Sequence, residues 1–308
     1  MKRIIAIPYN KNWFLGGNHF FNDLIDSFQN YSHKKIVFKV IHPDEIHNFY
    51  YDGIFSIRCH FLSSIDLRTI NCPIFLYHDD FHSYKFGRIL PSKELERIIR
   101  RVDLYFTTYL NYFDLKLFKS HSIKSHWVPW SVPSSIFMNT SFHDWLMREN
   151  TVVISGMNSY IYPLRKKIFT YSKHYPEDII KGLDHPSYEK NRGLIGDTYY
   201  AFLRNSKGAF ATTGEATINF SVMKYFEIPA SGCLPFFEDN PELRYLGFID
   251  GENCIIINEK NFKQRINIIK SPIAVEIAQN AFNLVKDHHT HNNRIEFISN
   301  MIANFLHL

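Results

Sequence analysis

Residues 212–237 read TTGEATINFSVMKYFEIPASGCLPFF, and this stretch decides how the second half of the chain is expected to fold. The apolar run GAFAT ends in it, and a glycine-bearing loop, a segment with helical spacing and a second apolar run follow. Strand, loop, helix and strand in this order are the repeating unit of a parallel α/β sheet. We expect the helix over residues 219–227, with Pro229 and Gly232 ending it.

The chemistry of this unit suits a nucleotide. A loop that leads into a helix offers free backbone N–H groups and the positive end of the helix dipole, which attract a diphosphate. A carboxylate near the other end of the helix, here Glu227, only accepts hydrogen bonds and can take both hydroxyls of a ribose. Spacing alone allows a second interpretation, in which Glu227 is a solvated helix charge and Gly232 a simple cap.

The same alternation of strands and helices extends outward over the whole chain. Short runs rich in Ile, Val, Phe and Tyr alternate with amphipathic stretches, which predicts parallel sheets covered by helices on both sides. The expected strands are residues 2–8, 35–41, 53–57, 73–77, 103–107, 151–155, 208–212, 233–237 and 254–257, with a further short strand led by residues 178–181. The expected helices are residues 19–28, 165–173, 197–204, 274–288 and 294–306.

The length of 308 residues predicts two domains, because domains usually span ~100–200 residues. The proline-broken segment SHWVPWSVPSSIF, residues 125–137, marks the exit from the first, and a helix is expected up to about Asn150. We therefore expect an N-terminal domain over 1–130, a C-terminal domain over 131–285, and a last helix over 286–308 that packs back toward the N-terminal domain.

Composition narrows the class of protein. The net charge of +5 is scattered, which fits a positive cleft for an anionic ligand and predicts no nucleic-acid partner. The four cysteines form no CxxC pair, as is typical of buried thiols in a reducing compartment. No apolar run approaches the ~20 residues of a membrane span, and MKRIIAIPYNKNW reads as a strand rather than a signal peptide. A soluble, cytoplasmic protein is the expectation.

The opening segment resembles the nucleotide-sugar motif of the glycosyltransferase group 1 families, most closely the branch of spore maturation protein B-like enzymes. That branch has a basic residue three places before the Glu and then a small pair ending in Gly, here Lys224, Glu227 and Ser231–Gly232. The resemblance covers roughly residues 103–306 and rests on the order of its motifs. The further motifs are Tyr162-Pro163-x-Arg165, Tyr200-x-x-x-Arg204-Asn205-Ser206-Lys207 and His289-Thr290-His291-x-x-Arg294.

The resemblance implies the GT-B fold, in which two Rossmann-like domains face each other across a cleft. It also implies a hexosyl or pentosyl transfer from a UDP- or GDP-sugar donor to an acceptor hydroxyl. Many group 1 enzymes carry a second Glu eight residues before the ribose-binding one, where this chain has Asn219, so the stereochemical outcome stays open. The implied donor-binding residues are Gly156, Arg165, Tyr200, Thr213, Gly214, Asn219, Lys224 and Glu227.

In the first domain, His78-Asp79-Asp80-Phe81-His82 follows the strand PIFLY, and carboxylates at a strand's carboxyl end point into the ligand cleft. We expect Asp80, ahead of Asp79 and His82, to take the acceptor's proton, although an N-cap or a surface charge fits equally. HDDFH lacks the spacing of a metal site. Arg165, Lys224 and backbone amides would meet the diphosphate charge, so we predict no metal ion and no cofactor.

The loop Gly16-Gly17-Asn18-His19 after the first strand is expected near the acceptor and the donor phosphates, or is an ordinary turn. His288, His289 and His291 are expected to form a solvated helix end. Two other functions compete with the transferase. One is a sugar- or nucleotide-binding protein of the same fold without turnover. The other is a DNA-base glycosyltransferase, which needs a basic, aromatic-rich acceptor face.

Overall fold

The computed structural model describes residues 2–10, 19–78, 92–110, 124–175, 178–184, 196–213 and 219–308. Its chain forms two compact units. The first unit contains Met1–Pro129 together with Asn292–Leu308, and the second contains Trp130–His291. None of the described helices combines the length and the apolar character that crossing a bilayer requires. The four cysteines are free thiols, buried except for the half-buried Cys72.

A six-stranded parallel sheet in the order β2-β1-β3-β4-β5-β6 forms the centre of the first unit. Its inner strand β3 is buried along its whole length, as expected of an apolar run with a helix on each face. The strands are β1 (Arg3–Pro8), β2 (Ile36–Ile41), β3 (Gly53–Ile57), β4 (Ile74–His78), β5 (Leu104–Thr107) and β6 (Ser125–Trp127). The helices are α1 (His19–Asn30), α2 (His60–Ser64), α4 (Ser92–Arg101) and α11 (His291–Phe305).

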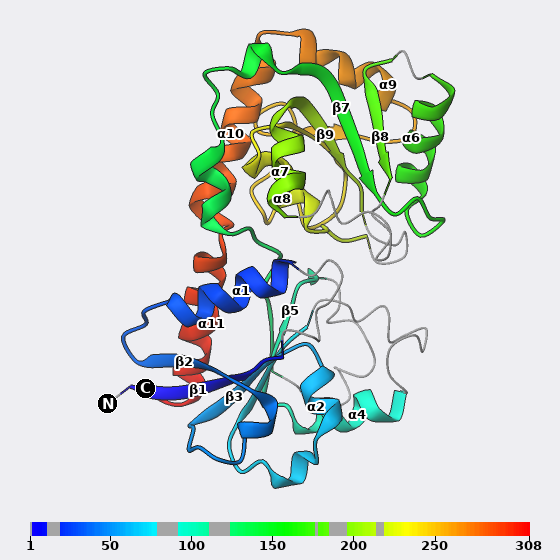
Figure 1. Cartoon of the computed structure of the whole chain (residues 1–308). Helices are drawn as coiled ribbons and strands as arrows, with labels where there is room; N and C mark the ends of the chain where they lie inside the picture. Colours follow the sequence, from blue (N-terminus) through cyan, green and yellow to red (C-terminus); the bar gives the residue numbers. More distant parts are fainter. Residues whose placement is uncertain are drawn as a thin grey trace. The chain divides into compact units, whose positions relative to one another are not determined.

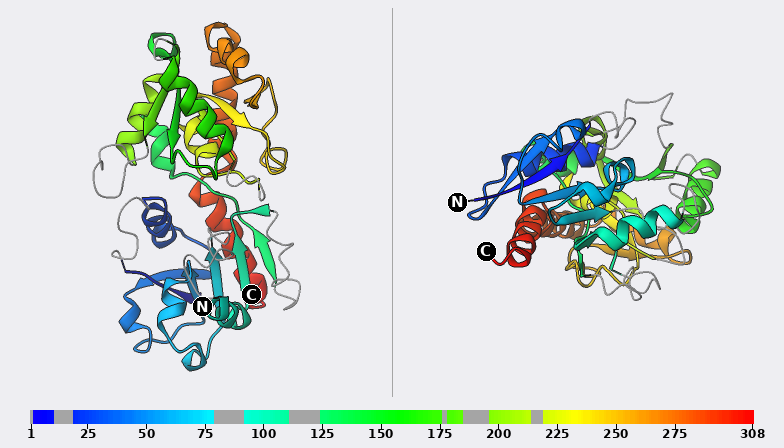
Figure 2. Two further views of the ribbon diagram at one scale, coloured as in Figure 1. Left: turned by 90° about the vertical axis from the view of Figure 1, so that its right-hand side faces the viewer. Right: turned by 90° about the horizontal axis from the view of Figure 1, so that it is seen from below.

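Aromatic side chains tie the helices of the first unit to its sheet. Phe28 of α1 lies 4.7 Å from Phe38 and 5.0 Å from Phe55, between ring centroids. Phe305 of α11 meets Phe75 of β4 at 5.6 Å. Helix α11, at the end of the chain, thus packs into the same core as the strands of the first unit. Figures 1 and 2 show the end of α11 beside the start of β1.

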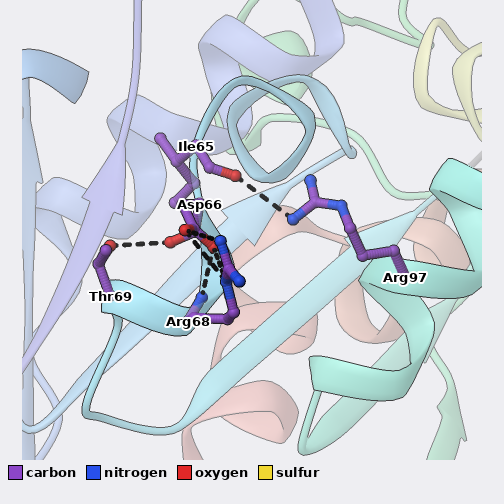
Figure 3. A network of polar contacts seen from close by, with 5 residues as sticks. All are labelled: Ile65, Asp66, Arg68, Thr69 and Arg97. Carbon is purple, nitrogen blue, oxygen red and sulfur yellow. Dashed lines mark hydrogen bonds and ion pairs between the residues drawn. The ribbon is translucent and has the colours of Figure 1, made fainter.

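Polar contacts fix the connection between β3 and β4 at the surface (Figure 3). The Asp66 carboxylate accepts hydrogen bonds from the Arg68 side chain and backbone, and these lower the pKa of Asp66 to about 2. Arg97 of α4 donates to the carbonyls of Leu62 and Ile65. The hydrogen bonds of Arg97 hold this loop against α4.

A five-stranded parallel sheet in the order β11-β10-β9-β7-β8 forms the second unit (Figure 1). Helix α6 packs on β7 and β8, whereas α8 packs on β9 and β10, and α10 packs on β10 and on α8. The strands are β7 (Glu149–Gly156), β8 (Ile180–Asp184), β9 (Ser206–Ala211), β10 (Leu234–Glu238) and β11 (Ile255–Ile257). The helices are α6 (Pro163–His174), α7 (Asp197–Arg204), α8 (Lys224–Ala230), α9 (Phe262–Arg265) and α10 (Ile273–His288).

The expected helix before Asn150 is wrong. Two 3-10 turns, Ser134–Asn139 and Trp145–Met147, take its place, and β7 starts at Glu149. The Trp145 indole is buried and donates to the Gly232 carbonyl, and Arg148 donates to the same oxygen. Hydrogen bonds from these two side chains to the connection between α8 and β10 therefore hold this segment, instead of the backbone hydrogen bonds of an α-helix.

The expected helix over residues 219–227 is also wrong, because α8 begins later and ends later. Asn219 has a φ of 52°, outside the helical region, and the Ser221 amide bonds to the Glu242 carboxylate. The helix continues through Pro229, where the amides of Ser231 and Gly232 cap the carbonyls of Glu227 and Pro229. Glu227 consequently lies in the first turn of α8 and not near its other end.

The histidines near residue 290 are not all solvated. His288 is exposed, but His289 and His291 are buried. His289 Nε2 donates to the Leu246 carbonyl over 2.8 Å, and His291 Nδ1 lies 2.8 Å from Ser131 Oγ. The backbone of this segment also pairs with Val132. These two side chains are therefore structural members of the second unit.

Candidate functional site

Two cationic side chains meet at the carboxyl end of β7, over Gly156. This glycine has a φ of 106°, a conformation that residues with a Cβ rarely adopt. A Cβ added there would lie 2.9 Å from Arg165 Nη1 and 3.3 Å from Lys224 Cε. Glycine at this position therefore lets a side chain of α6 and one of α8 approach the end of the same strand.

Arg165 is held in a fixed position although it is almost entirely buried, with 4% of its surface exposed. Its Nε donates to Thr212 Oγ1 over 3.0 Å, and its guanidinium carbon lies 3.8 Å from the centre of the Tyr162 ring. Burial lowers the pKa of Arg165. Within the described part of the chain, neither Arg165 nor Lys224 has a carboxylate oxygen within 4.0 Å. Arg165 is buried and Lys224 is half-buried. Cations withdrawn from water without a carboxylate partner are costly, and an anion bound between them would remove that cost.

Glu227 lies three residues after Lys224, so both side chains project from one face of α8. The carboxylate is 4% exposed, and among the described residues it accepts one side-chain hydrogen bond, from Tyr200 over 3.4 Å. Burial raises the pKa of Glu227, and the nearby Lys224 charge opposes that rise. A buried carboxylate with so few donors retains lone pairs for the hydroxyls of a ligand.

Tyrosines of α7 complete the wall beside these charges. The Tyr199 hydroxyl and Ser155 Oγ lie 2.9 Å apart, and Lys224 Nζ lies 4.8 Å from the centre of the Tyr199 ring. Burial lowers the pKa of Lys224 and raises that of Tyr199. The site therefore combines two cations, one carboxylate and neutral phenols in a largely dry environment, where electrostatic interactions are strong.

Glu238 is a member of this region that the sequence analysis missed. It ends β10, and its Oε2 accepts the Thr213 amide over 2.9 Å, while its backbone carbonyl accepts the Tyr225 hydroxyl over 2.8 Å. Burial raises the pKa of Glu238. The signal was present, because a carboxylate directly after a buried parallel strand is the pattern that drew attention to Asp79 and Asp80.

The structure thus brings Gly156, Arg165, Lys224, Glu227 and Tyr200 together, with Thr213 held nearby by Glu238. Asn219 is described, but no hydrogen bond joins it to the others in the described part of the chain. Seven predicted residues lie outside the described residues: Gly16, Gly17, Asn18, Asp79, Asp80, His82 and Gly214. His19 begins α1, and its side chain is not described. Among the side chains that are described, no three of His, Cys, Asp or Glu gather closely enough to hold a metal ion.

Residues 146–300, half of the chain, match the family described as Glycosyl transferase-like, and the chain belongs to that family. The predicted resemblance to glycosyltransferases is confirmed at this level. The family match names no narrower branch, so the likeness to spore maturation protein B-like enzymes stays a prediction. No curated protein sequence matches the chain.

Solved structures match over nearly the whole length. An alpha-glucosyltransferase in complex with UDP and a DNA 13-mer has a TM-score of 0.72 at 12% identity, over 98% of this chain and 100% of that one. Anabaena HepE in complex with UDP-glucose has a TM-score of 0.64 at 12% identity, over 98% and 100%. A sucrose-phosphate synthase from Thermosynechococcus elongatus has 0.62 at 11%, over 99% of both chains. At such identities the likeness concerns the fold, and the predicted GT-B fold with two parallel sheets is confirmed.

Proposed function

We propose that this glycosyltransferase moves a hexose or pentose from a UDP- or GDP-sugar to an acceptor hydroxyl, and that the second unit holds the donor. The observation that carries the proposal is the pair of cations, Arg165 and Lys224, over Gly156 without a carboxylate partner in the described chain. The UDP complexes of HepE and of the alpha-glucosyltransferase support the donor class.

In this proposal the donor diphosphate lies between Arg165 and Lys224, and Glu227 accepts hydrogen bonds from the ribose hydroxyls. During transfer the bond between the sugar C1 and the diphosphate oxygen breaks, and a bond from C1 to the acceptor oxygen forms. Negative charge then grows on the leaving diphosphate, where two preorganised cations stabilise the transition state more than the bound donor. We therefore also propose that the reaction needs no divalent ion.

The acceptor proton goes to a base that we assign to the segment after β4. Asp80 is the first candidate, followed by Asp79 and His82, because carboxyl ends of parallel strands carry the catalytic groups of such folds. The loop of Gly16, Gly17, Asn18 and His19 after β1 is proposed to lie near the acceptor and the donor phosphates. Because Asn219 stands where many group 1 enzymes have Glu, the proposal covers both transfer with retention and transfer with inversion at the sugar C1.

The proposed acceptor is a glycan or a lipid-linked carrier in cytoplasmic polysaccharide synthesis. A DNA base is the alternative, because an alpha-glucosyltransferase crystallised with DNA shares the fold over the whole chain. The scattered charge of +5 favours the first class. Incubation with labelled UDP-glucose and either hydroxymethylated DNA or a panel of glycans separates the two.

The test of the donor proposal is calorimetric titration with UDP, GDP and their common sugar conjugates, followed by a thermal-shift measurement. A ligand at ~100 times its Kd should add ~2.7 kcal/mol to the free energy of unfolding. Adenosine diphosphate serves as the matched control, because it carries the same diphosphate on a different base. If neither UDP nor GDP binds more tightly than inorganic diphosphate, the proposed donor site is wrong.

A further inference from the structure

A buried carboxylate, that of Glu242, bonds to the segment that leads into α8. Glu242 follows β10 and is fully buried, at 0% exposure, as is Ser221 at 1%. Its Oε2 accepts the Ser221 amide over 2.8 Å. Ser221 lies only three residues before Lys224 and six before Glu227, so this bond constrains the start of the helix that carries both.

Asn240 joins the same contact from a second side. Its Oδ1 accepts the Ser221 hydroxyl over 3.1 Å and the Glu242 amide over 3.0 Å. The Asn240 amide oxygen thus links the segment of Ser221 to the segment of Glu242. This link fixes the position from which the Glu242 carboxylate accepts the Ser221 amide. A hydrogen bond that a carboxyl oxygen accepts is directional, which suits a contact that must set a position.

The turn that carries Glu242 is itself anchored in the core of the second unit. Leu243 and Leu246 are buried beside it, and the amides of Tyr245 and Leu246 bond to the Glu242 carbonyl. Phe248, which follows, packs edge-on against Phe237 of β10 at 5.0 Å. The turn is therefore packed against the sheet, and through its contact with Ser221 it restricts the position of that residue.

A local reason for such a tether is visible in the backbone. Asn219 has a φ of 52°, which a residue with a Cβ adopts at some cost, and α8 has only seven residues. So short a helix is not stable by itself, and its position depends on tertiary contacts. Binding groups need placement to within ~0.5 Å, which supporting hydrogen bonds supply.

We infer that Glu242, with Asn240, is a positioning residue of the donor site, which sets Lys224 and Glu227 in their binding geometry through Ser221. This inference rests on the proposed function, because it takes the donor nucleotide as the ligand of α8. Glu242 itself does not touch the ligand in this account.

The test measures UDP affinity by calorimetry at a temperature well below each variant's melting point. Glu242→Ala should raise the Kd for UDP about 10-fold, since the hydrogen bond that Glu242 accepts from the Ser221 amide is lost from the support of the site. Glu242→Gln keeps an accepting oxygen and should restore the Kd to within ~3-fold of the parent value. Should Glu242→Ala not fold, Glu242→Asp, with a carboxylate one methylene shorter, replaces it with the same expectation.

Asp52→Ala is the matched control. Asp52 accepts the Ile4 amide over 2.8 Å with a side chain only 13% exposed, but it lies in the first unit. Asp52→Ala should have a lower melting temperature than the parent protein and the same affinity for UDP. An unchanged Kd in folded Glu242→Ala, or an equal loss in Asp52→Ala, overturns the inference. A parent protein that binds neither UDP nor GDP contradicts the proposed function instead.

Discussion

At the scale of single residues, the site depends on a glycine that admits two cations to one strand end. Burial lowers the pKa of both Arg165 and Lys224, and the Arg165 charge lowers that of Lys224 further. The unliganded site therefore carries an electrostatic cost that a diphosphate would relieve, with its charge held by preorganised groups. This arrangement favours tight binding of nucleoside diphosphates over uncharged nucleosides.

The role of Glu227 gives the first prediction. Glu227→Ala should weaken UDP binding by about 10- to 100-fold, because hydrogen bonds to a buried charged group contribute ~1.5–3 kcal/mol. Glu227→Asp should rescue poorly, since its carboxylate is one methylene shorter. Glu259→Ala removes an exposed carboxylate of the same unit that pairs with Lys167, and it should bind as the parent does. Calorimetric titration decides, and equal affinities for parent and Glu227→Ala would refute the assignment.

The second prediction concerns the base. Asp80→Asn should fold normally and bind donor, but its turnover should fall on the order of 100-fold or more because no carboxylate takes the acceptor proton. The reason is its position two residues after β4 (Ile74–His78). Turnover is measured at saturating donor, with Asp66→Asn as the control on the preceding loop. Near-parent turnover would move the role to Asp79 or His82.

At the scale of elements, α11 closes the first unit with aromatic contacts. Phe297 of α11 lies 6.0 Å from the His126 ring of β6, and His126 lies the same distance from Phe106 of β5. The helix thereby covers the edge strand of the sheet. This contact of the helix with the edge strand includes the His126 imidazole. Burial lowers the pKa of His126.

This lowered pKa gives the third prediction. In the unfolded chain His126 binds a proton near its ordinary pKa of about 6.5, whereas the folded protein resists it. The free energy of unfolding should therefore fall as the pH drops below about 6.5, until the folded pKa is passed. His126→Phe, which keeps a ring, should lose part of this pH dependence in urea titrations at pH ~7.5 and ~5.5. The exposed His47→Gln is the control, and an unchanged slope in His126→Phe would contradict the account.

At the scale of the whole molecule, each unit contains a parallel sheet, and the carboxyl ends of parallel strands are where folds of this class bind ligands. In the second unit Gly156 and Glu238 are the last residues of β7 and β10, and Thr212 directly follows β9. In the first unit the ends of β1 and β4 precede the two predicted acceptor-side segments. We propose that the fold uses the same structural position twice, for a nucleotide in the second unit and for an acceptor in the first.

The fourth prediction follows from the charges of the second unit. Because Arg165 and Lys224 are proposed to supply the positive charge for the leaving diphosphate, transfer should continue in EDTA at the rate seen without it. Arg165→Ala should abolish most turnover in the same assay, whether or not Mg²⁺ is added. A loss of turnover in EDTA that Mn²⁺ or Mg²⁺ restores would contradict this prediction.

Much of the architecture was predictable from the chain alone, because local physics determines it. Strands buried on both faces must be unbroken apolar runs, so β3 was predicted at its observed bounds and β4 and β10 within one residue. The order of the motifs around Arg165, Lys224 and Glu227 was likewise sufficient to predict the glycosyltransferase family. Neither conclusion needed contacts between distant residues.

Only the tertiary structure decided how those residues meet. The bounds of α8 depend on Glu242, which bonds to Ser221 from beyond β10, and the burial of His289 depends on the Leu246 carbonyl. The approach of Arg165 and Lys224 over Gly156 joins three elements that no spacing rule connects. The physical reason is the same in each case. Hydrogen-bond partners and close approaches between residues far apart in the chain leave no periodic trace in the sequence, whereas the burial of a strand does.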